Sequence, residues 1–178
     1  MNENKQTNEL GTGSIPKLFF KLAIPAVVAQ VVNLLYNIVD RIYIGHIPEI
    51  GASALTGVGL FASIMMFITA FSMLAGAGGA PLASIALGKN DKDHAEKIMT
   101  NSFLLLLVFA VILTVVIYIL APTLLTMFGA SEVTLPYAVD YARIYVLGTV
   151  FVLLVTGMNP FVTTQGFANI AMLTTVIG

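Results

Sequence analysis

The stretch PAVVAQVVNLLYNIVDRIYI (residues 25–44) is apolar except for a few polar side chains, and these determine how it can sit in a protein. They recur at spacings of three, four and three, which places them on one stripe of an α-helix. An ionised side chain in hydrocarbon is costly and normally faces a bundle interior or a water-filled cavity. The stretch therefore predicts a membrane helix whose polar seam forms one wall of an internal chamber. We define the polar seam as Gln30, Asn33, Asn37 and Asp40.

Asp40, the ionisable member of the polar seam, has a second interpretation. It lies roughly 27 Å along the helix from Leu22, toward one end of the predicted span. There it could form an interfacial ion pair with Arg41, although adjacent helical residues point about 100° apart and pair poorly. Both a chamber carboxylate and a structural one remain open from these residues alone.

The composition places the chain in a lipid bilayer. It has 178 residues, of which 58% are hydrophobic and 10% are charged, with a mean hydropathy of +0.94. Soluble domains carry roughly 25% charged residues. The net charge of −1 gives no basic field for binding nucleic acid. The absence of cysteine excludes disulfides and thiolate metal sites.

The apolar runs predict an all-α, polytopic helical bundle preceded by a polar cytoplasmic tail at residues 1–14. Four runs are long enough to span a bilayer, and the final run of twelve residues is too short. We therefore expect the sequence to be cut inside a fifth helix, or to be a piece of a longer protein. The predicted helices are 22–44, 52–87, 98–120, 133–156 and the truncated 167–178.

Glycine and proline predict where these helices bend or end. The run GAGGAP (76–81) is expected to bend or end the second helix. Pro122 is expected to stop the third, and a polar break is expected over residues 157–166. The many small residues between 57 and 80 favour close helix approach.

The fourth run carries charged and aromatic side chains at helical spacing. Asp140 and Arg143 lie three residues apart on one face, so we expect a structural ion pair. Tyr137, Tyr141 and Tyr145 form an aromatic stripe. Packing or an interfacial position is favoured for these tyrosines over contact with a substrate.

The distribution of lysine predicts the orientation of the chain. The N-terminus and the second loop carry all the lysines near the spans, and the first and third loops carry none. By the positive-inside rule, the N-terminus and second loop are cytoplasmic in a multi-pass protein of the cell inner membrane. Asp40 then lies in the outer part of the bilayer. The lysines are Lys17, Lys21, Lys89, Lys92 and Lys97.

No constellation in the sequence predicts an enzyme. There is no paired-carboxylate, histidine-rich or Ser/His arrangement at catalytic spacing. We therefore expect no catalytic residue and no cofactor.

Five stretches, in order, resemble the multidrug and toxic compound extrusion (MATE) transporters. They are IPKLFFKLAIPA (15–26), NLLYNIVDRIYIG (33–45), GASALTGV (51–58), GAGGAPLASIALGK (76–89) and MNPFVTTQG (158–166). The resemblance covers almost all of the chain after residue 14.

The resemblance implies a protein built from two six-helix lobes that are related by pseudo-symmetry. Such proteins export cationic or amphipathic organic compounds in exchange for Na⁺ or H⁺ by alternating access. Residues 15–178 would then be a partial N-terminal lobe. The C-terminal lobe needed for transport, and a second carboxylate on the fifth helix, would lie beyond residue 178.

The resemblance also implies roles for particular residues. Asp40 stands where the family has its first-helix coupling carboxylate, and the amide of Asn37 would supply a neutral oxygen beside it. Such oxygen ligands suit a hard cation, so Na⁺ at Asp40 is the one metal we expect. We expect the substrate chamber to be lined by Gln30, Asn33, Tyr36 and Asn159.

The leading hypothesis is thus the N-terminal part of a cation-coupled antiporter for drugs and other toxic organic compounds. A flippase for lipid-linked precursors is an alternative, but it would require a cationic cavity. The only intramembrane cations, Arg41 and Arg143, each lie near an acid. A non-transporting membrane fragment or assembly partner is the third alternative.

Overall fold

A computed structural model describes residues 14–177 of the chain. Of the tail predicted at residues 1–14, residues 1–13 lie outside the described residues. The described part contains helices and no strands, which confirms the all-α fold class. Its helices are α2 (Ile15–Gly45), α3 (Gly51–Gly88), α4 (Lys92–Met127), α5 (Leu135–Leu147), α6 (Thr149–Thr164) and α7 (Ala168–Ile177).

Three of these helices, α2, α3 and α4, are long and apolar enough to cross a membrane. Helices α5 and α6 make a fourth span if they are taken together, with a bend of 59° between them. Helix α7 has 10 residues, which is too few to cross on its own. The chain is therefore a multi-pass membrane protein.

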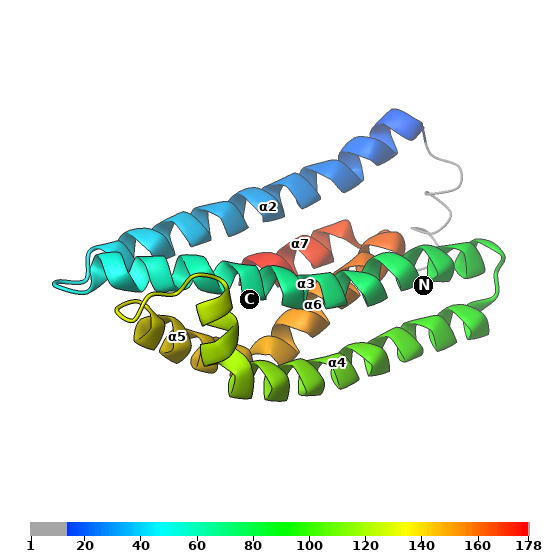
Figure 1. Ribbon diagram of the computed structural model, residues 1–178. Coiled ribbons are helices and arrows are strands. Elements are labelled where there is room, and N and C mark those ends of the chain that lie inside the picture. The colour runs from blue at the N-terminus through cyan, green and yellow to red at the C-terminus, as the bar shows by residue number, and fades with distance from the viewer. Residues whose placement is uncertain (1–13, 178) are drawn as a thin grey trace.

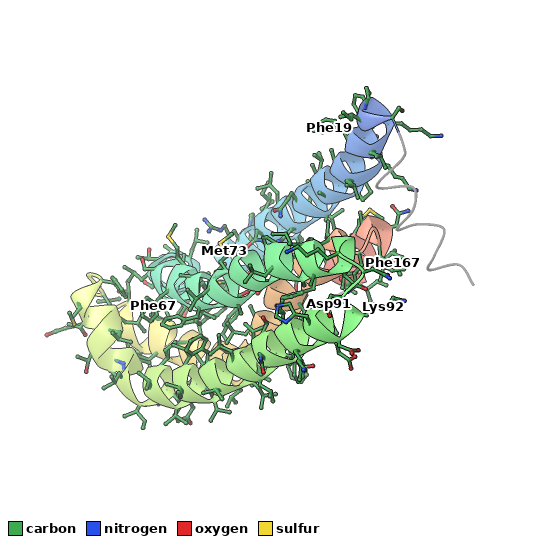
Figure 2. All side chains as sticks on the ribbon, turned by 90° about the vertical axis from the view of Figure 1, so that its right-hand side faces the viewer. Phe19, Phe67, Met73, Asp91, Lys92 and Phe167 are labelled. Atoms are coloured by element: carbon green, nitrogen blue, oxygen red, sulfur yellow. The ribbon has the colours of Figure 1, made fainter. Side chains whose placement is uncertain are left out.

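Helix α3 occupies the middle of the bundle. Figure 1 shows α2 and α4 on opposite sides of α3, while α7 packs against α2 and α6. The α2–α3 turn and the α4–α5 connection lie at one end of the bundle. In the view of Figure 2, Asp91 and Lys92 of the α3–α4 turn lie at the opposite end, which faces the viewer. Phe19, near the start of α2, stands well away from the other labelled side chains.

The core forms where α3 meets α4, α5 and α6. Phe61 and Ile68 of α3 are almost fully buried, as are Leu106 of α4 and Leu153 of α6. Glycine makes the closest approach possible, because a Cβ added to Gly76 would lie 2.7 Å from the carbonyl oxygen of Gly157. The expectation that small residues bring helices together is confirmed at this crossing.

Two helices continue through prolines that were expected to interrupt them. Helix α3 runs through residues 76–81 to Gly88, so an end at GAGGAP is wrong. Helix α4 runs to Met127 with Pro122 inside it, although its last part turns away from the rest of the helix (Figure 1). Proline removes one backbone hydrogen bond, whereas ending the helix in lipid would expose several polar backbone groups.

The break in the fourth span also lies elsewhere than expected. Helix α6 continues through Asn159 and Pro160 to Thr164, so a break beginning at residue 157 is wrong. Gly157 is buried there against Leu106, which explains its presence within a helix. The chain bends instead at Gly148, between α5 and α6. It turns again at Gly166, whose φ of 89° favours glycine.

Candidate functional site

The polar seam lies on α2, the least covered of the long helices. All four of its side chains are exposed, and so is Tyr36. Only 11% of the most apolar window of α2 is buried, although the helix contacts α7 and α3 along part of its length. The described part of the chain therefore builds one wall beside the seam and leaves the seam itself open.

Two amides of the polar seam are joined along the helix. Nδ2 of Asn37 donates to the backbone oxygen of Asn33 at 2.8 Å and to its Oδ1 at 3.1 Å. These bonds fix the orientation of the Asn37 side chain. Both bonds use Nδ2 of Asn37, so its Oδ1 remains available as a neutral hydrogen-bond acceptor.

Asp40, at the end of the polar seam, forms no hydrogen bond or ion pair among residues 14–177. The interfacial ion pair with Arg41 is thus not formed.

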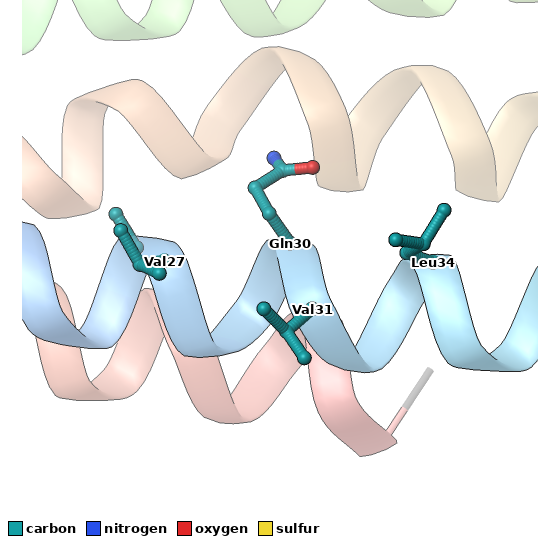
Figure 3. A pocket seen from close by; sticks show the side chains of 5 residues that line it. Val27, Gln30, Val31 and Leu34 are labelled. Atoms are coloured by element: carbon teal, nitrogen blue, oxygen red, sulfur yellow. The ribbon is translucent and has the colours of Figure 1, made fainter.

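A shallow hollow of about 330 Å³ lies beside the first part of the polar seam. Figure 3 shows the amide of Gln30 extending from α2, with apolar side chains around it. The hollow thus offers one hydrogen-bonding side chain, Gln30, in an otherwise apolar surface. It is lined by Ala26, Val27, Gln30, Val31 and Leu34.

Asn159 lies on α6 and is held by α7. Its Nδ2 donates to Oγ1 of Thr175 at 3.1 Å, and its Oδ1 accepts from Oγ1 of Thr174 at 3.0 Å. Sequence reasoning missed both threonines as partners. The available signal was a pair of adjacent hydroxyls in an otherwise apolar run, facing a predicted polar residue one helix earlier. The role of Asn159 in lining a chamber stays a prediction.

The tyrosines of α5 pack as expected. The rings of Tyr141 and Tyr145 lie edge-on to Phe61, with centroids 5.3 Å and 5.1 Å away. Both are packed against the main core. The expected packing is thus seen for this pair, while the absence of substrate contact stays a prediction.

The ion pair expected between Asp140 and Arg143 is not formed in the described part of the chain. The guanidinium of Arg143 lies instead over the ring of Tyr118 in α4, 5.6 Å from its centroid. Helical spacing brings the two charges onto one face, but a long side chain such as that of Arg143 can adopt several rotamers, and only some of them reach Asp140. Here a cation–π contact holds the arginine.

Residues 14–177 contain no group of three or more His, Cys, Asp or Glu side chains that could hold a metal ion. The site therefore consists of amides, one carboxylate and apolar side chains on spanning helices. That combination defines a membrane protein with an intramembrane polar wall. An ionisable residue in such a place marks a pathway for ions or substrates by default.

Comparison with known proteins identifies the family. The MatE family model matches residues 25–178, so the chain belongs to the MATE family. It is 26% identical over 160 residues to the Multidrug export protein MepA of Staphylococcus haemolyticus (strain JCSC1435), covering 90% of this chain and 35% of that protein. The chain therefore spans about a third of the length of this curated relative.

Solved structures agree with this assignment. A crystal structure of MATE in complex with MaD3S superposes with a TM-score of 0.84 at 28% identity, covering 94% of this chain and 37% of that one. An outward-facing multidrug resistance MATE transporter of the MOP superfamily gives a TM-score of 0.82 at 28% identity, covering 94% and 36%.

Proposed function

We propose that this chain is the N-terminal part of an antiporter that exports drugs and other toxic organic compounds in exchange for Na⁺ or H⁺. The observation that carries the proposal is Asp40. It is a carboxylate on a membrane-spanning helix, exposed and without a hydrogen-bond or ion-pair partner among residues 14–177. Family membership and the name of the relative MepA support a role in the export of drugs.

The arrangement suggests how exchange would work. A charged Asp40 attracts a cationic compound or Na⁺, and the free oxygen of Asn37 adds a neutral ligand one turn away. Binding of the coupling cation or a proton neutralises the carboxylate and releases a cationic cargo. Because the exported compound and the coupling ion compete for the same carboxylate, their movements are coupled.

The hollow beside Gln30 fits the apolar part of such a cargo. One amide among apolar side chains would orient a bound compound while selecting only weakly among compounds. The open side of the polar seam requires a second wall. Since the relatives are about two and a half times as long, we assign that wall to the C-terminal lobe implied by the family.

The decisive experiment uses the product of the complete reading frame that contains this chain. We expect Asp40→Asn to abolish drug-dependent Na⁺ or H⁺ flux and dye efflux while leaving expression intact. Dissipating the Na⁺ and pH gradients separately identifies the coupling ion.

Glu132→Gln is the matched control, because this acid is exposed in the α4–α5 connection and is not part of the polar seam on α2. It should leave efflux unchanged. Normal coupled efflux by the Asp40→Asn protein would contradict the proposal.

A further inference from the structure

Arg143 lies on an outward surface formed by α4 and α5. It is exposed, and its guanidinium rests over the ring of Tyr118. The surrounding surface is strongly apolar: Ile144 is 75% exposed, Leu147 65% and Ile119 67%. A permanent cation in such a surface needs an anion from its surroundings, since Asp140 does not pair with it among the described residues.

This surface lies on the side of the bundle away from the polar seam. Figure 1 shows α2 and α4 on opposite sides of α3, and Arg143 contacts α4 through Tyr118. The transport site proposed above and this surface are therefore formed by different residues on different helices.

Helix length would place the two charges near the boundary between hydrocarbon and headgroups. A helix of 38 residues such as α3 is about 57 Å long, so roughly 13 Å extends past each side of an ~30 Å hydrocarbon core. Helix α5 begins at the same end of the bundle (Figure 1). Asp140 and Arg143 lie five and eight residues after Leu135, roughly 8 and 12 Å along the axis.

The order of the charges matches one class of lipid. Asp140 lies roughly 4.5 Å closer to the nearer membrane surface than Arg143, on the same helix face. In a zwitterionic phospholipid, the phosphate lies next to the glycerol and the ammonium lies further out. The negative group of the protein would thus meet the ammonium, and the positive group would meet the phosphate.

We propose that Arg143, Asp140 and Tyr118 form a binding site for an aminophospholipid headgroup of the phosphatidylethanolamine type. Arg143 donates to the phosphate oxygens, which its planar fork fits well. Asp140 accepts hydrogen bonds from the primary ammonium. Tyr118 supports the guanidinium and provides the interfacial ring common at this depth. The exposed apolar side chains contact the acyl chains.

The test measures bound lipid by native mass spectrometry of the full chain, purified in detergent. The chain is equilibrated with an equimolar mixture of phosphatidylethanolamine, phosphatidylcholine and phosphatidylglycerol. We expect phosphatidylethanolamine to be retained preferentially, because choline cannot donate hydrogen bonds and glycerol carries no cation. Arg143→Gln should reduce its retention roughly fivefold. Asp140→Asn should remove its preference over phosphatidylglycerol while leaving phosphate binding.

A charge swap separates lipid binding from a purely structural role. The double variant Asp140→Arg/Arg143→Asp keeps one acid and one base but reverses their order, so it should lose the lipid preference. Glu132→Gln is a control that should keep it, and circular dichroism checks that each variant is helical.

Several results would contradict the proposal of a lipid-binding site. They are equal retention of the three lipids by the unmodified chain, unchanged retention by Arg143→Gln, or a preserved preference in the charge swap. A chain dimer that is lost in Arg143→Gln would assign the surface to a second copy instead.

Discussion

Single hydroxyl groups show how this chain satisfies polar atoms inside a membrane. Half of the helical threonines in the described residues donate to the carbonyl four residues earlier, as Thr69 does to Met65 at 2.9 Å. Thr149 forms no such bond, and the oxygen of Tyr145, four residues earlier, accepts the N–H of Gly148 where α5 ends. Thr149 Oγ1 is the fully buried side-chain oxygen that has no partner in the described residues. The bend therefore carries an energetic cost at one atom.

Replacing Thr149 by valine removes that unsatisfied hydroxyl at nearly constant volume. We expect the protein to become more stable by about 1–2 kcal/mol, because the desolvation penalty of the hydroxyl disappears. Equilibrium unfolding in detergent micelles measures the change.

The same substitution at Thr156 is the comparison. Its hydroxyl is 2.5 Å from that of Ser72, which is 99% buried. Thr156→Val leaves Ser72 unpaired and should destabilise the protein by about 1–3 kcal/mol. Destabilisation by Thr149→Val would show that its hydroxyl has a partner after all.

Pairs of helices are positioned by a few contacts at which backbones nearly touch. The crossing of α3 and α6 depends on Gly76, which has Gly157 and the ring of Pro160 against it. Gly79, one turn later on α3, lies against Phe161 and Ser102. A side chain at these positions would meet backbone atoms, packed rings or the hydroxyl of Ser102, so the helices would have to separate.

Gly76→Ala tests that crossing. The new methyl group would lie 2.7 Å from the carbonyl oxygen of Gly157, so α3 and α6 must move apart. We expect a loss of about 1–3 kcal/mol in the free energy of unfolding, as is typical of overpacking.

Gly78→Ala provides a matched control on the same helix, because nothing lies within 4 Å of its added Cβ. That change should be neutral or stabilising by up to ~1 kcal/mol, since alanine is the better helix former. Equal effects of the two substitutions would contradict close packing at Gly76.

The orientation of the molecule can be tested by chemical labelling, since these 178 residues contain no cysteine. Glu132 and Lys89 are exposed at opposite ends of the bundle, in the α4–α5 and α3–α4 connections. With the N-terminus and the lysine-rich loop in the cytoplasm, Glu132→Cys should react with an impermeant maleimide in intact cells. Lys89→Cys should react only after the cells are opened. The reverse pattern would contradict the positive-inside assignment.

Much of the architecture could be predicted from the sequence because lipid imposes simple rules. Apolar runs located the spans, and helical spacing placed the polar seam of α2 on one face. The errors came from reading Pro122 and the Asn159-Pro160 pair as helix breakers. Inside a bilayer a helix tolerates proline, because the alternative exposes more backbone.

The details of the candidate site depend on which helices become neighbours. The partners of Asn159, Thr174 and Thr175, follow from the packing of α7 on α6, which spacing along either helix does not specify. The cation–π contact of Arg143 likewise required knowing that α4 runs beside α5. Local periodicity determines faces, whereas tertiary packing determines partners.

The link between Asn159 and the two threonines has a consequence for biosynthesis. Ribosomes make α6 before α7, so the amide of Asn159 reaches the insertion machinery while its partners are still untranslated. Alone in lipid, that amide would lack hydrogen bonds, which costs several kcal/mol. Helices α6 and α7 should therefore leave the translocon together, as a hairpin whose polar groups have already been matched.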